Sequence, residues 1–279
     1  MIIEVAIMAK HNYMPTCCKD ICKCLTNASP RYSTWEIYED WLMMSAIAIS
    51  NSVDWQQADE REKEYLRIAK KYDKNELDNM ASALGMLITQ LDEAYEREGL
   101  TDILGQVFHA LELHNKYHGQ FFTPFHICEL MGQMTLGDNI SNVDDAIKSQ
   151  GYISCLEPCI GSGGLVIGLA EAMRKNKYNH QKQLVITGVD IDIKCVCMSY
   201  IQLSLLGIPA VIVHGNSLTV EQWSVWRTPM YMIGGWEHKI KHSKDSYLTT
   251  PKEQDKKVSK PATYELKLPE KKNGQFSLF

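Results

Sequence analysis

Glu157-Pro-Cys-Ile-Gly-Ser-Gly-Gly164 lies between an apolar stretch, Tyr152 to Leu156, and a helix-forming run, Leu165 to Met173. The apolar stretch predicts a buried strand. The glycines after it let the backbone turn tightly and approach a ligand before the helix begins. Many strand-to-helix turns need glycine for packing alone, so this turn indicates a ligand site only in combination with other signals.

A second acidic strand end, Gly188-Val-Asp-Ile-Asp192, follows about one βα unit later. Leu184 to Val189 predicts another apolar strand, and Asp190 stands where a carboxylate can accept both hydroxyl groups of a ribose. Further strands are predicted near 210–214 and 229–233. The pattern therefore predicts an α/β protein with a Rossmann-like sheet that binds a nucleoside cofactor.

Five motifs occur in a fixed order along the chain. They are Asp102-Ile-Leu-Gly105, Gly119-Gln-Phe-Phe-Thr-Pro124, the two strand ends quoted above, and Leu206-Gly-Ile208 with Gly215-Asn-Ser-Leu218. In this order, over roughly residues 100–218, the chain resembles adenine-N6 DNA methyltransferases, and most of all the modification subunits of type I restriction-modification systems. The fold that this resemblance implies is an S-adenosylmethionine-dependent methyltransferase sheet preceded by an α-helical domain.

The resemblance implies S-adenosylmethionine as the cofactor and assigns residues to each part of it. Asp190 would hold the ribose, Ile191 would lie against the adenine, and Asn216, where the family usually has Asp, would accept a hydrogen bond from the adenine amine. Taken singly, Phe122 could equally be a core aromatic and Asn216 a turn residue. The residues expected at the methionine end are Phe122, Thr123 and Pro124, and those expected around the middle are Glu157, Pro158, Gly161 and Gly163.

The catalytic tetrapeptide of the family is missing. Adenine-N6 methyltransferases carry Asn-Pro-Pro-aromatic or Asp-Pro-Pro-aromatic, which accepts hydrogen bonds from the adenine amine and stacks on the flipped base. This chain has no Pro-Pro, and Thr228-Pro-Met-Tyr231 is the degenerate counterpart. The expected catalytic residues are Thr228, Pro229 and Tyr231; the alternative is that residues 223–236 form only a core edge or an interaction surface.

The sheet is also expected to be truncated. The family's sheet has seven strands, and three more strands with their helices cannot be built from the polar residues 237–279. Either another chain or the tail covers the sheet edge, or the protein is one part of a split system. Sequence-specific recognition of DNA would then come from a partner.

Composition favours an intracellular protein with only local contacts to DNA. The 279 residues carry a net charge of −5 with a pI near 6.0, which gives no overall DNA-binding field. We expect no signal peptide and no membrane span, hence a cytoplasmic location. Nine cysteines without secretory features indicate reduced thiols, and the spacing within Cys17 to Cys24 does not match a zinc site, so no metal is expected.

Four segments are expected along the chain: a Cys-containing segment (1–30), a helical domain (31–118), the cofactor-binding domain (119–236) and a flexible Lys-rich tail (237–279). The helical domain, opened by a Ser33-x-x-Glu36 capping box, would contact DNA or partner subunits, or would simply cover the cofactor domain. The tail ends in a peptide resembling those that dock on the bacterial sliding clamp, with Gln275, Leu278 and Phe279 as its contacts.

Three functions remain open on the sequence alone. The first is an adenine-N6 DNA methyltransferase, active alone or with a partner. The second is a degenerate relative that binds the cofactor but serves as an accessory or regulatory subunit at replicating DNA. The third, least favoured by the motifs, is methylation of RNA or protein.

Overall fold

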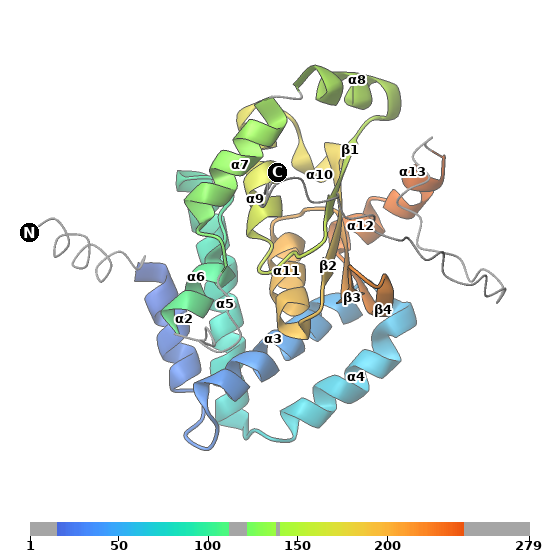
Figure 1. Ribbon diagram of the computed structural model, residues 1–279. Coiled ribbons are helices and arrows are strands. Elements are labelled where there is room, and N and C mark those ends of the chain that lie inside the picture. Colours follow the sequence, from blue (N-terminus) through green and yellow to red (C-terminus); the bar gives the residue numbers. More distant parts are fainter. Residues whose placement is uncertain (1–15, 112–121, 138–139, 243–279) are drawn as a thin grey trace, which may run out of the picture. The chain divides into compact units, whose positions relative to one another are not determined.

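A computed structural model describes residues 16–111, 122–137 and 140–242 (Figure 1). All of these residues belong to one unit, residues 1–248, and residues 249–279 form a second unit. Residues 243–279 of the predicted tail, with the clamp peptide, therefore lie outside the described residues, whereas its residues 237–242 are described and are helical. The four-part division of the chain stays a prediction.

The described residues up to 110 are largely helical, as the sequence predicts from Ser33 onward. The Ser33 capping box is confirmed, because its side chain accepts from the Glu36 N–H while the Glu36 carboxylate accepts from the Ser33 N–H. Asp73 and Glu76 form a second capping box. The helices are α2 (Thr16–Thr26), α3 (Thr34–Asn51), α4 (Trp55–Ala69), α5 (Lys74–Arg97) and α6 (Ile103–Ala110).

The rest of the described chain builds a four-stranded sheet in which every strand pairs only with its neighbours in sequence, in the order β1-β2-β3-β4. The first three strands are parallel and β4 is antiparallel to β3. The strands are β1 (Ile153–Glu157), β2 (Leu184–Asp190), β3 (Ala210–Asn216) and β4 (Glu221–Arg227); the helices are α7 (Phe125–Gly137), α8 (Ile140–Gln150), α9 (Gly164–Lys175), α10 (His180–Gln183), α11 (Ile193–Leu205), α12 (Pro229–Ile233) and α13 (Trp236–His242).

The predicted strand at 229–233 is wrong. These residues form helix α12, with Thr228 at its N-cap and Pro229 in its first turn, where the missing proline N–H costs nothing. The fourth strand lies earlier, at β4, and returns from β3 as a hairpin. Its sequence, EQWSVWR, does not alternate cleanly between apolar and polar residues.

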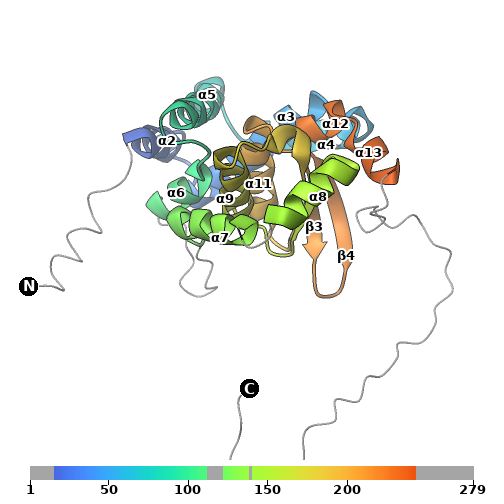
Figure 2. The same cartoon turned by 90° about the horizontal axis from the view of Figure 1, so that it is seen from above.

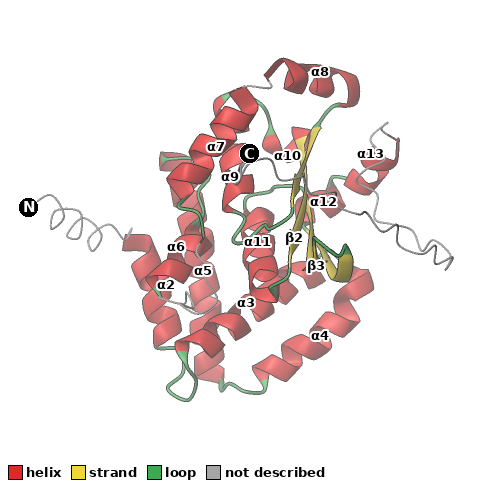
Figure 3. Ribbon diagram, viewed as in Figure 1, coloured by secondary structure: helices red, strands yellow, loops and turns green. Residues whose placement is uncertain are grey.

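Helices cover both faces of the sheet, and Figures 2 and 3 show α9 and α11 on the side opposite α12 and α13. Successive strand residues point to opposite faces of the sheet. Ile186 and Ile212 belong to the large core that includes the N-terminal helices. Val185 and Val211 belong to a small core with Tyr231 and other residues of α12 and α13. The N-terminal helices and the sheet thus share one hydrophobic core.

The two edges of the sheet differ. At β4 the buried Arg61 side chain donates a hydrogen bond of 2.8 Å to the Val225 carbonyl and lies over the Trp226 ring, so α4 covers this edge. Strand β1 pairs with β2 alone among the described residues, and its Leu156 side chain is 63% exposed. An uncovered edge strand offers unpaired backbone groups to another strand.

Candidate cofactor-binding site

The glycine turn after β1 has the backbone form that the sequence predicts. Gly161 and Gly163 have φ values of 56° and 92°, which residues with a side chain rarely adopt. The Ile160 N–H donates to the Val189 carbonyl at 2.9 Å, and the Gly163 N–H donates to the Ile160 carbonyl at 2.9 Å. The turn is therefore fixed at the carboxyl ends of β1 and β2 before α9 begins.

Asp190, the last residue of β2, links the glycine turn to the turn that follows β2. One carboxylate oxygen accepts from the Gly161 N–H and the other from the Asp192 N–H, both at 2.9 Å. Burial raises the pKa of Asp190, and the backbone hydrogen bonds oppose that shift. Each oxygen keeps a further lone pair for a ligand hydroxyl. Beside it, Ile191 is 61% exposed and offers an apolar surface at the same edge.

Phe122 lies on the other side of the glycine turn. Its ring stands 3.2 Å from the position that a Cβ on Gly161 would take, so only glycine fits there without displacing the ring. The centroids of the Phe122 and Phe108 rings are 4.8 Å apart. The backbone carbonyl oxygen of Phe122 lies 3.3 Å from the Nε2 atom of His109. The structure brings together Phe122, Gly161 and Asp190.

The remaining expected cofactor residues also lie near this edge of the sheet. Thr123, Pro124 and Pro158 are exposed, and the Glu157 carboxylate accepts from the Cys159 N–H at 3.2 Å. Asn216 ends β3, and its amide oxygen accepts from the Leu218 and Thr219 N–H groups at 2.9 and 3.3 Å. That oxygen shapes the β3–β4 turn, which is the alternative that the sequence left open.

Thr228, Pro229 and Tyr231 lie at the other end of the sheet. Because β4 is antiparallel, Thr228 stands beside Ala210 at the start of β3, about 20 Å along the strand from its carboxyl end. The Thr228 hydroxyl is fully buried, donates to the Ile208 carbonyl and accepts from the Ala210 N–H, both at 2.9 Å. The structure does not bring this expected catalytic tetrapeptide to the glycine turn.

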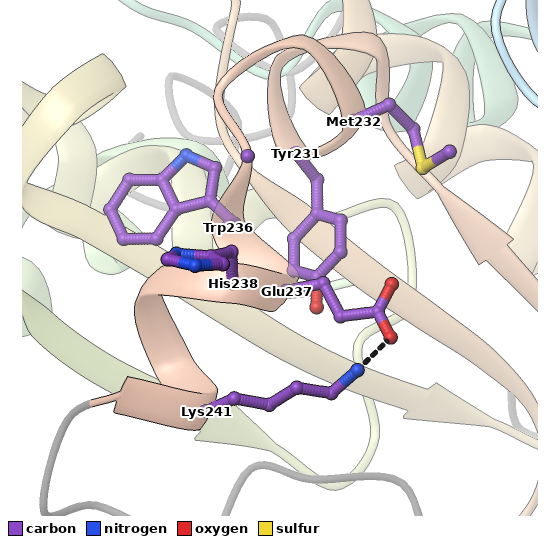
Figure 4. Close-up of a pocket in the computed structure, with 7 residues that line it drawn as sticks. Tyr231, Met232, Trp236, Glu237, His238 and Lys241 are labelled. Atoms are coloured by element: carbon purple, nitrogen blue, oxygen red, sulfur yellow. Dashed lines mark hydrogen bonds and ion pairs between the residues drawn. The ribbon is translucent and has the colours of Figure 1, made fainter.

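Tyr231 is buried in the small core, next to a pocket lined by residues of α12 and α13 (Figure 4). Glu237 and Lys241 form an ion pair across one helical turn at its rim. The lining residues are Tyr231, Met232, Gly235, Trp236, Glu237, His238 and Lys241. This pocket opens at the end of the sheet opposite the glycine turn and shares no residue with it.

Three residues at the glycine turn were not assigned to the site from the sequence. Asp102 opens one of the five motifs, but no role in the site was expected for it; it caps α6 by accepting from the Gly105 N–H at 2.7 Å. It also accepts from the Ser162 hydroxyl at 2.6 Å and from the Gln202 amide at 2.8 Å. No local pattern predicts contacts between residues 60 and 100 positions apart.

The fold and the site define an α/β protein whose parallel strand ends hold a nucleoside cofactor at a glycine turn. Residues 96–277, more than half of the chain, match the N-6 DNA Methylase family. The chain belongs to this family of methyltransferases, as the sequence motifs predict. No curated protein matches the chain significantly.

One similar solved structure is that of a candidate class I S-adenosylmethionine-dependent methyltransferase from Listeria monocytogenes. The sequences are 17% identical, and the TM-score is 0.41. The match covers 72% of this chain and 54% of that one, so the chain spans about half the length of the Listeria protein.

S-adenosylmethionine is the cofactor of the family, and the residues present fit it. The turn has no side chain at Gly161 or Gly163, a carboxylate at the ribose position and an exposed apolar side chain beside it. The described ranges contain no cluster of three His, Cys, Asp or Glu residues able to hold a metal ion. Within the same ranges no helix combines the length and apolarity of a membrane span.

Proposed function

We propose that this chain is the cofactor-binding part of an adenine-N6 DNA methyltransferase and that a partner chain supplies the catalytic tetrapeptide. Bound S-adenosylmethionine supplies an electrophilic methyl group to the site. The residues of this chain would bind and orient it: Asp190 would accept from the ribose hydroxyls, Ile191 would lie against the adenine, and the backbone of residues 160–163 would surround its middle.

The observation that carries the proposal is the separation of the glycine turn from Thr228. An adenine amine is a poor nucleophile, because its lone pair is shared with the ring, and it needs hydrogen-bond acceptors beside the methyl group. Thr228 uses its hydroxyl within the fold at the far end of the sheet. A strand added parallel to β1 on its uncovered edge would end beside Glu157 and the glycine turn, which is where those acceptors are required.

The net charge of the chain also supports a partner chain that contacts the DNA. A net charge of −5 does not attract DNA as a whole, so the chain would contact DNA locally and the partner would provide most of the binding surface. The likeness to modification subunits of restriction-modification systems motivates a DNA substrate. A DNA substrate in turn motivates a cytoplasmic location.

The test is cofactor binding and methyl transfer with the same purified protein. By calorimetry we expect the chain to bind S-adenosylmethionine, and we expect no transfer of radiolabelled methyl groups to unmethylated DNA by the chain alone. Transfer should begin when a family member with an intact Asn-Pro-Pro-aromatic tetrapeptide but a disabled glycine turn is added. Transfer by the chain alone would contradict the need for a partner, and absent binding would contradict the whole proposal.

A second function is favoured by the buried hydrogen bonds of Thr228. If Thr228 has only a structural role, the chain could serve as a cofactor-binding accessory subunit. Gln275, Leu278 and Phe279, which lie outside the described residues, would bring it to replicating DNA. Cofactor binding without transfer under any complementing condition would favour this function over the first.

A further inference from the structure

A buried polar cluster lies directly beneath the glycine turn. Asp102 is 2% exposed and Ser162 3% exposed, and Gln202 is fully buried. One Asp102 oxygen accepts from the Gly105 N–H and the Gln202 amide, and the other accepts from the Ser162 hydroxyl. The Gln202 amide also donates to the Ser162 carbonyl at 2.8 Å, while its oxygen accepts from the Leu104 N–H at 2.9 Å.

The Asp102 carboxylate is held by neutral donors and by two helix ends. It caps α6, and one of its oxygens lies 3.0 Å from the position that a Cβ on Gly164, the first residue of α9, would take. The N-cap of α9, Gly163, has no side chain to cap that helix. The carboxylate thus caps one helix and lies close to the start of a second, and a helix N-terminus is a position that favours a negative charge.

The same helix supports the opposite side of the cofactor site. Phe108 and His109 of α6 contact Phe122, whose ring packs on Gly161. Helix α6 therefore fixes the glycine turn through Asp102 and the facing aromatic ring through its last turn. The shape of the site depends on both contacts.

The geometry points to Asp102 as a positioning residue for the S-adenosylmethionine site, acting through the Ser162 hydroxyl to hold residues 160–164 in the cofactor-binding conformation. Without that bond, Gly161 and Gly163 have free access to other backbone conformations, and cofactor binding has to order the turn. The inference concerns the cofactor site alone, so it holds whether or not methyl transfer needs a partner.

The test compares Ser162→Ala and Asp102→Asn with two controls. Ser199→Ala removes a buried hydroxyl that donates to the Val196 carbonyl and lies beside Gly163 without bonding to the turn. Asp54→Asn alters a buried carboxylate paired with Arg61, remote from the turn. Below the melting temperature of every variant, Ser162→Ala should raise the Kd for S-adenosylmethionine about tenfold, in line with a lost hydrogen bond to a charged group.

Asp102→Asn should raise the Kd less, since its amide can still meet the Ser162 oxygen but now points an N–H toward the start of α9. Both controls should change the Kd by less than about twofold, whatever they do to the melting temperature. In the double variant Asp102→Asn with Ser162→Ala the two effects on the Kd should combine to less than their product, because both substitutions act on the Ser162–Asp102 bond.

A second readout does not require cofactor binding. With ¹⁵N-glycine labelling, the Gly161, Gly163 and Gly164 amide signals should broaden in Ser162→Ala and stay sharp in Ser199→Ala. An unchanged Kd together with sharp signals in Ser162→Ala would overturn the inference. If wild type itself fails to bind the cofactor, the proposed function fails, while the glycine signals still decide whether Asp102 orders the turn.

Discussion

Replacing Thr228 by valine separates a structural role from a catalytic one. Valine keeps the shape of threonine, so the substitution removes the hydroxyl without opening a cavity. Two hydrogen bonds of 2.9 Å disappear, one to the Ile208 carbonyl and one from the Ala210 N–H, at a side chain with no solvent exposure. Each neutral hydrogen bond contributes about 1 kcal/mol, and a buried unpaired N–H adds to the cost. We expect the free energy of unfolding to fall by about 2–3 kcal/mol.

Urea denaturation followed by circular dichroism measures this change, with an m-value equal to that of wild type. The control is Thr89→Val, whose hydroxyl donates to the Gly85 carbonyl on an exposed helix face, and which should cost less than about 0.5 kcal/mol. The Kd for S-adenosylmethionine should be unchanged in both variants. A loss below about 0.5 kcal/mol in Thr228→Val would refute the structural role. So would the loss of methyl transfer in a complemented assembly that remains folded.

The remaining predictions concern the tetrapeptide, the site, the helix packing and the tail. Thr228→Asn with Met230→Pro, which restores Asn-Pro-Pro-Tyr, should give no gain in DNA methylation because these residues stand at the far end of the sheet; a gain would show that they reach the cofactor. Burial raises the pKa of Asp190, and only its ionised form accepts from both ribose hydroxyls and the Gly161 N–H, so cofactor affinity should fall on acidification at a higher pH than for an exposed aspartate. Asp190→Asn should abolish that pH dependence in calorimetric titrations. Gly168→Ala should destabilise the fold by about 1–3 kcal/mol, because its Cβ would stand 2.4 Å from the Cys128 carbonyl where α7 crosses α9; a melting temperature equal to wild type would contradict that close packing. Deleting residues 275–279 should abolish binding to the bacterial sliding clamp without changing the circular dichroism spectrum, and an unchanged affinity in a calorimetric titration would rule out the docking peptide.

The glycine turn and Asp190 could be predicted because their signals are local. An apolar run predicts each strand, and the residues after it need a particular backbone or a carboxylate whatever the rest of the chain does. The Ser33 capping box was readable for the same reason, since both of its hydrogen bonds join residues three positions apart.

The position of Thr228 and the role of Asp102 could not be predicted, because both depend on pairings between distant segments. The apolar run Met230 to Ile233 suits a strand as well as a short helix, and only the hairpin from β3 decides between them. Pro229 after a threonine was the one local sign of a helix start. Asp102 meets Ser162 and Gln202 only after α6, α9 and α11 have packed together.

The strand order has a consequence for how the sheet forms. Because each strand hydrogen-bonds only to strands next to it in sequence, no strand has to wait for a segment synthesised much later. We expect the sheet to assemble from β1 towards β4 as the chain emerges, with the two parallel pairings each closing over a helical crossover and only the β3–β4 hairpin closing locally. Asp102 and α6 are synthesised before β1, whereas Gln202 of α11 follows the glycine turn, so the buried cluster beneath the turn is completed only after β2 and α11 have emerged.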